Sequence, residues 1–81
     1  MDKVADEAHR KALCARLARV EGQLRGLQRL IETEADREKV AQQMAAARKA
    51  LDKAFFAMVA GQIADRRVSA EEAADLLLRF A

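Results

Sequence analysis

The chain has 81 residues, with 15 Lys and Arg against 13 Asp and Glu, one cysteine, three glycines and no proline, tryptophan or tyrosine. This length allows one domain at most, and the composition is typical of long helices, so we expect a single all-α domain over residues 1–81. A formal charge of +2 does not require a polyanionic partner, a lone cysteine excludes an intrachain disulfide, and the lack of a long apolar run favours a cytoplasmic protein that does not bind membranes.

Apolar residues recur with alternating gaps of four and three between about residues 4 and 32, which predicts a first long helix with a heptad seam. The seam consists of Leu13, Leu17, Val20, Leu24, Leu27 and Ile31. At about 100° per residue, Arg16, Arg19 and Gln23 fall together beside this seam. Gly22 and Gly26 lie next to that polar strip, and each costs about 0.8–1 kcal/mol relative to alanine inside a helix. Close approach of another backbone would explain them.

A second helix is predicted over about residues 35–65, with Thr33 as its N-cap and Asp36 as a short capping-box partner. Its seam consists of Val40, Met44, Ala47, Leu51, Ala54 and Met58, widened by Phe55, Phe56 and Val59. Ser69 and Glu72 fit a capping box that starts a short third helix, whose apolar residues are Leu76, Leu77, Leu78 and Phe80.

Two long antiparallel helices bury only one side of each other. The broad apolar seams therefore predict a homodimer that forms a four-helix bundle. Further apolar residues on the second and third helices favour pairing of dimers into a tetramer.

The polar strip of the first helix has two interpretations. Arginines beside an apolar seam are often solvated flanks whose aliphatic stems cover the core. Guanidinium groups also suit phosphates and guanine edges, and glutamine can pair with adenine, so the strip equally fits a DNA-contacting surface. Periodicity alone does not choose between the two.

Two blocks carry a family resemblance: RLARVEGQLRGLQRLIE at residues 16–32 and QQMAAARKALDKA at residues 42–54. Over about residues 10–68, in sequence and in spacing, the chain resembles the copper-, nickel- and formaldehyde-responsive repressors of the CsoR/RcnR/FrmR family. The resemblance implies a helical dimer or tetramer that binds double-stranded operator DNA and is released when an effector occupies a site between protomers. It also implies DNA contacts by Arg16, Arg19 and Gln23, extended by Lys53 and Arg48.

The chain departs from the family at the sensing site. Metal-sensing members carry a cysteine near the start of the second helix, and a histidine followed by a cysteine or histidine near its end. Here these positions hold Arg37, Gln62 and Arg66. An arginine cannot be deprotonated to coordinate a metal and an amide is a poor soft ligand, so we expect neither a metal at these positions nor a cofactor.

These substituted positions leave two interpretations open. Arg37 and Arg66 can pair with Asp36, Glu38 or Asp65 and brace the interface. Alternatively, the arginines gather across a dimer into a pocket for a small anionic effector, because paired guanidiniums suit carboxylate and phosphate.

His9 and Cys14 are the remaining soft or borderline donors. They are five residues apart on one helix and point about 140° away from each other, so a chelate would need ligands from another protomer. The simpler interpretation is a small semi-buried Cys14 and a polar His9 on the flank of the helix.

The sequence therefore predicts a DNA-binding repressor that does not sense metal through the usual positions. The alternative is a helical oligomerisation scaffold without DNA affinity, which the charge of +2 keeps open. We expect no enzyme, because the chain has no Ser-His-Asp or Cys-His arrangement and no phosphate loop, although an arginine- and glutamine-lined cavity could stabilise an anionic transition state.

Overall fold

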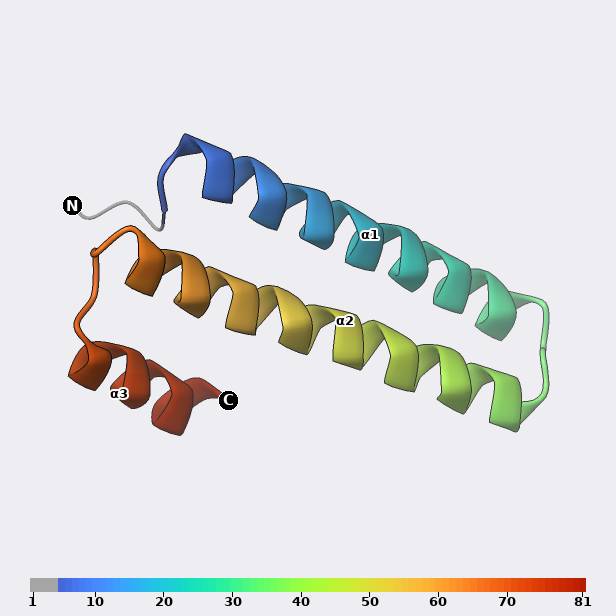
Figure 1. Cartoon of the computed structure of the whole chain (residues 1–81). Coiled ribbons are helices and arrows are strands. Elements are labelled where there is room, and N and C mark those ends of the chain that lie inside the picture. Colours follow the sequence, from blue (N-terminus) through green and yellow to red (C-terminus); the bar gives the residue numbers. More distant parts are fainter. Residues whose placement is uncertain (1–4) are drawn as a thin grey trace.

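The computed structural model describes residues 5–81, which form three helices: α1 (Glu7–Glu32), α2 (Arg37–Ala64) and α3 (Ala70–Phe80). The long helices α1 and α2 make an antiparallel hairpin, and α3 turns back along the C-terminal part of α2 (Figure 1). The described residues contain no strand, and α3 contacts α2 alone. The predicted all-α class, with two long antiparallel helices and a short third one, is confirmed.

Side chains at the helix starts fix where each helix begins. Asp6 accepts a hydrogen bond from the backbone N–H of His9 at 3.0 Å, so α1 begins at Glu7. Its predicted start at about residue 4 lies outside the described residues. Ser69 and Glu72 form the predicted capping box of α3, with reciprocal bonds of 3.1 and 3.0 Å.

The predicted N-cap of α2 was wrong. Asp36 caps α2 by accepting a hydrogen bond from the backbone N–H of Lys39 at 3.0 Å. Thr33 instead ends α1, where its hydroxyl donates to the carbonyl of Arg29 at 2.8 Å. The chain needs Glu34 and Ala35 to reverse direction, which moves the start of α2 past Thr33.

Both long helices end on a residue with left-handed backbone that is not glycine. Glu34 after α1 and Arg66 after α2 each have a φ of 56°. In each case the next residue donates its N–H to the carbonyl five residues before it, from Ala35 to Leu30 and from Arg67 to Gln62, at 2.9 Å. This is the Schellman pattern, in which glycine is the favoured left-handed residue.

The core uses only half of each seam. Val20 and Leu27 of α1 are buried, as are Ala47 and Ala54 of α2. The alternate seam residues stay about half exposed in one chain, namely Leu17, Leu24 and Ile31 on α1 and Met44 and Leu51 on α2. A single chain therefore leaves a continuous apolar face uncovered, as the two-helix geometry requires.

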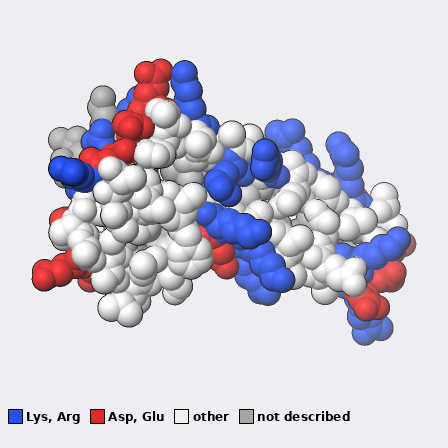
Figure 2. Space-filling view, in the orientation of Figure 1, with Lys and Arg blue, Asp and Glu red and all other residues white. Residues whose placement is uncertain are grey.

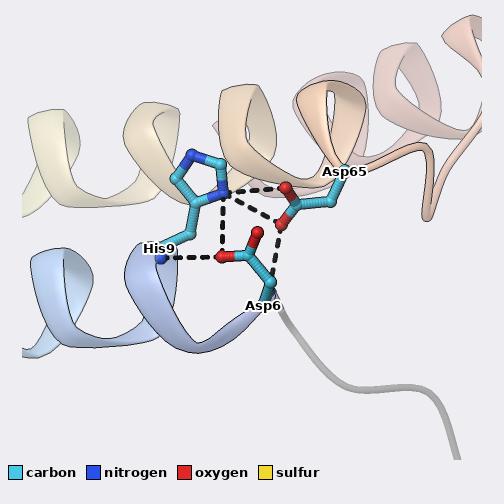
Figure 3. Close-up of polar contacts among 3 residues, drawn as sticks. All are labelled: Asp6, His9 and Asp65. Atoms are coloured by element: carbon cyan, nitrogen blue, oxygen red, sulfur yellow. Dashed lines mark hydrogen bonds and ion pairs between the residues drawn. The ribbon is translucent and has the colours of Figure 1, made fainter.

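A polar cluster joins the start of α1 to the end of α2 (Figure 3). His9 Nδ1 lies 2.9 Å from both carboxylate oxygens of Asp65, and the backbone N–H of Asp6 donates to Asp65 Oδ2 at 3.0 Å. The hydrogen bond to Asp65, and then the charge of Asp65, raise the pKa of His9. The Asp6 N–H, and then the bond to His9, lower the pKa of Asp65.

Replacing Glu34 by glycine should stabilise the fold by about 0.5–1 kcal/mol, because glycine has no Cβ to oppose the left-handed backbone. Urea unfolding at one fixed protein concentration measures the change. Glu32→Gly, inside the last turn of α1, is the matched control and should destabilise by about 1 kcal/mol. A Glu34→Gly protein that is less stable than the parent would show that the Glu34 side chain contributes more than its backbone conformation costs.

The His9–Asp65 pair predicts a pH window. A raised His9 pKa gives stability that is complete below the ordinary value of 6.5 and is lost as the pH rises through the folded-state pKa. A lowered Asp65 pKa gives stability present above 3.8 and lost as the pH falls through its folded-state pKa. The destabilisation caused by His9→Gln, from urea midpoints, should therefore be larger at about pH 5.5 than at about pH 8.5. Equal destabilisation at both pH values would show that the charge of His9 does not contribute.

Candidate functional site

Four of the five residues assigned to DNA contact line one cavity. Arg16, Arg19 and Gln23 of α1 meet Lys53 of α2 around a volume of about 230 Å³, with Ala50 completing its wall. The three α1 residues share a face because they are spaced by three and four, and antiparallel packing sets Lys53 opposite them. In Figure 2, Lys and Arg side chains gather over the middle of the two long helices. We call this site the basic cavity.

The cations of the basic cavity are not neutralised by carboxylates of the described chain. Within residues 5–81, none of Arg16, Arg19 and Lys53 takes part in an ion pair. Other basic residues do, such as Arg25, which lies 3.7 Å from Glu21. The guanidinium and ammonium donors of the basic cavity are therefore available to an anion.

Gln23 brings an unsatisfied acceptor to the same place. Its side-chain Oε1 is buried and has no hydrogen-bond partner among the described residues. Its backbone carbonyl accepts from Gln43 Nε2 at 3.4 Å, a bond that ties α2 to α1 at this level. A buried acceptor without a donor is costly, so a ligand that donates a hydrogen bond here would relieve it.

The two α1 glycines are not explained by packing within the chain. A Cβ at Gly22 would have no neighbour within 4 Å, and one at Gly26 would only meet Gln43 Nε2 at 3.9 Å. No backbone of the described chain approaches either residue closely. If a close approach explains them, it is made by another molecule.

Arg48 lies apart from the basic cavity. It lines a separate apolar groove of about 230 Å³ together with Val20, Leu24, Leu27, Met44, Ala47 and Leu51. Five residues separate Arg48 from Lys53, which turns the two side chains about 140° from each other around α2. The structure thus brings four of the five predicted residues together and leaves the fifth beside the uncovered apolar face.

The three substituted sensing positions do not meet within one chain. Arg37 is the first residue of α2, whereas Gln62 is near its end and Arg66 follows it. Gln62 lies 25 positions after Arg37, which is about 37 Å along the helix, so only a second copy can bring the two together. These side chains offer a metal no imidazole, thiolate or carboxylate, so their chemistry does not fit a metal site.

Two of the three carboxylates expected to pair with these arginines are engaged elsewhere. Asp36 caps α2 and Asp65 accepts from His9 and from the backbone of Asp6. Within residues 5–81, neither Arg37 nor Arg66 forms an ion pair.

His9 has partners that the sequence did not reveal. Asp6, His9 and Asp65 are the described residues whose potential metal-ligand atoms converge in a group of three, all within 4.8 Å of one another. An aspartate three residues before His9 is a recognisable N-cap signal, but its meeting with Asp65 depends on how α1 and α2 pack. Cys14, expected to be semi-buried, is exposed and does not join this group.

His9 lines a smaller hollow that shares one residue, Arg16, with the basic cavity. It has a volume of about 190 Å³ and is lined by Ala5, His9, Ala12, Leu13, Arg16, Ala57, Met58 and Gly61. Arg16 also lines the basic cavity, so it stands at the boundary between the two. The His9 ring packs over Gly61, where a Cβ would lie in van der Waals contact with His9 Cγ at 3.4 Å.

None of the described helices is long and apolar enough to cross a membrane. No curated protein and no solved structure shows significant similarity to the chain. A family described as metal-sensitive transcriptional repressors matches residues 9–79, which include all of α2 and almost all of α1 and α3. Since this match spans nearly the whole chain, the protein belongs to the family of metal-sensitive transcriptional repressors.

Proposed function

We propose that this repressor binds double-stranded operator DNA through the basic cavity. Family membership supports the regulatory class, and a repressor family is not an enzymatic one. The observation that supports DNA as the ligand is the convergence of Arg16, Arg19, Gln23 and Lys53 on one cavity, with no carboxylate paired to its cations in the described chain. Phosphates are the anions that such a group of cations binds along a duplex.

The side chains of the basic cavity have different roles in DNA recognition. Arg16, Arg19 and Lys53 carry the positive charge and contact phosphates, which fixes the position of the protein on the duplex. Gln23 supplies a side-chain amide, and an amide can pair with the N6 and N7 edge of adenine. Gln23 is therefore the residue of this group suited to reading sequence.

The uncovered apolar face packs against a second copy of this chain. It combines Leu17, Leu24 and Ile31 of α1 with Met44 and Leu51 of α2, so both helices of each hairpin enter the contact. Two hairpins joined in this way make a four-helix bundle that carries two basic cavities, suited to two half-sites of an operator.

A second apolar region supports the tetramer. Phe56 and Ile63 of α2 are about half exposed, and Leu78 and Phe80 of α3 are 86% and 62% exposed. These residues lie outside the face assigned to the dimer, so they remain free to join two dimers.

The substituted sensing positions take an anion in this assembly. Pairing of α2 helices brings Arg37 of one chain toward the far end of α2 in the other, where Gln62 and Arg66 lie. Guanidinium groups not held by the chain's own carboxylates suit a small carboxylate or phosphate as effector.

Alanine at Arg16 or Arg19 should weaken binding to duplex DNA from upstream of the coding sequence by about 1–3 kcal/mol, and should reduce the slope of log K against log salt by about one. Fluorescence anisotropy at several salt concentrations, beside a scrambled duplex, measures both. Arg29→Ala removes the same charge from the last turn of α1, outside the basic cavity, and is the matched control. Equal losses in all three variants would indicate only non-specific attraction, and no preference for the native duplex would favour the scaffold alternative.

Lysine at Leu24 should prevent dimerisation, because it places a charge in the centre of the uncovered apolar face. Light scattering coupled to size exclusion gives the mass, and circular dichroism shows whether the helices remain. Leu78→Lys on α3 is the control and should reduce a tetramer to a dimer without producing monomers. A Leu24→Lys protein with the mass of the parent assembly would rule out this face as the dimer contact.

A further inference from the structure

We propose that Asp6, His9 and Asp65 form a binding site for a divalent transition-metal ion such as Zn²⁺, Ni²⁺ or Co²⁺. The family is metal-sensitive, yet positions 37, 62 and 66 offer no suitable donors. Among the described residues, the potential metal ligands that do converge are these three, two at the start of α1 and one just after α2 (Figure 3). The binding itself does not depend on the proposed DNA interface.

The spacing of the donor atoms fits a common ion. His9 Nδ1 lies 2.9 Å from each oxygen of Asp65 and 3.4 Å from Asp6 Oδ1. An ion bound at about 2.0–2.2 Å from each ligand holds neighbouring ligand atoms about 3.0–3.5 Å apart, whether its geometry is tetrahedral or octahedral. The two separations from His9 therefore already match those around a bound ion, and the donor oxygens of Asp6 and Asp65 lie within 4.8 Å of each other.

The chemistry of the donors defines the class of metal. One imidazole nitrogen and two carboxylates are borderline to hard ligands, which suit Zn²⁺, Ni²⁺, Co²⁺ and Mn²⁺ and do not suit Cu(I). Three protein ligands leave coordination positions open for water. Zn²⁺ and Ni²⁺ bind such sites more tightly than Mn²⁺, in line with the general order of divalent affinities.

Backbone hydrogen bonds hold two of the ligands in place before an ion arrives. Asp6 accepts from the backbone N–H of His9, and Asp65 accepts from the backbone N–H of Asp6, each at 3.0 Å. The Asp65 side chain is only 11% exposed, whereas those of His9 and Asp6 are 43% and 51% exposed. An ion can thus enter from the open side and meet an oriented carboxylate below, the arrangement in which outer contacts tune a metal site.

The helix dipoles and charged side chains around Asp6, His9 and Asp65 neither cause nor prevent the binding of a cation. The positive end of the α1 dipole and the negative end of the α2 dipole meet here and largely offset each other. Arg16 is the charged residue that shares the adjoining hollow with His9. His9 Nδ1 must give up any proton that it carries before it can coordinate an ion: an imidazolium releases one proton to solvent, whereas a neutral ring keeps its single proton on Nε2.

Occupation of this site reaches the basic cavity through Arg16, and this consequence rests on the proposed function. The ion replaces the hydrogen bonds between the His9 ring and Asp65, and His9 lines the same hollow as Arg16. Arg16 lines the basic cavity as well, and the ion offsets the negative charges of Asp6 and Asp65 that act on its guanidinium. We expect metal binding to change DNA affinity.

Titration of the metal-free full chain with Co²⁺, followed by its visible absorption, and with Zn²⁺, followed by calorimetry, tests the site. The expected result is saturable binding of one ion per chain. Asp6→Asn should weaken binding at least about tenfold, the loss that even outer contacts of a metal ligand cause. Asparagine is as good an N-cap as aspartate, so this variant keeps α1 intact. His9→Gln and Asp65→Asn should also weaken binding.

Two control variants sharpen this test. Cys14→Ser removes the thiol, and Asp75→Asn removes a carboxylate that pairs with Arg79 on α3, so both should bind metal like the parent. Parent binding that is unsaturable, or that Asp6→Asn leaves unchanged, would overturn the proposal and leave the cluster as an ion pair only. DNA anisotropy with and without Zn²⁺ is read separately, so failure of DNA binding and failure of metal binding are distinguishable.

Discussion

The register of α1 against α2 is the constraint on which the other features of this repressor depend. Small residues of α2, including Ala47, Ala54 and Gly61, are buried and let α1 lie close. Close packing of this kind permits few alternative alignments, because a shift along the helix would place bulkier side chains opposite each other. The same alignment places Lys53 by the arginines of α1 at mid-length and Asp65 by His9 at the open end.

The hairpin has two chemically different sides. This is because the apolar seam of each long helix is wider than the strip that packs against the other long helix. On α1, the residues on one side of the buried line are apolar and uncovered. The residues on the other side of this line are arginines and a glutamine. The proposed dimer contact and the proposed DNA contact therefore lie on different surfaces of the hairpin. Arg48 lines the apolar groove and so belongs to the first of these surfaces.

Much of this fold can be predicted from the sequence, because it depends on residues that are close together in the chain. The period of the leucines gives the helices, Ser69 and Glu72 give the start of α3, and spacing by three and four gathers Arg16, Arg19 and Gln23. Choosing between Thr33 and Asp36 as the cap of α2 required the geometry of the turn, where the left-handed residue is Glu34 and not a glycine that the sequence would signal. The position of Arg48 could not be predicted from the sequence, because it depends on how α2 is rotated about its own axis.

The contact between His9 and Asp65 lay beyond sequence reasoning. The two residues are 56 positions apart, and only the relative alignment of two long helices decides that they meet. A shift of one helical turn, about 5.4 Å, would separate them. The roles predicted for the DNA-contact residues and the sensing positions likewise depend on contacts with other molecules, which a single chain does not contain.

The small size of the buried side chains has a consequence for the life of this protein in the cell. The core consists of alanines with two valines and one leucine, so folding of one chain removes little apolar surface from water. In the proposed dimer, further apolar surface is buried when two copies meet, and the folded fraction then depends on protein concentration. A single chain at low concentration would then unfold more often and be cleaved more readily by proteases.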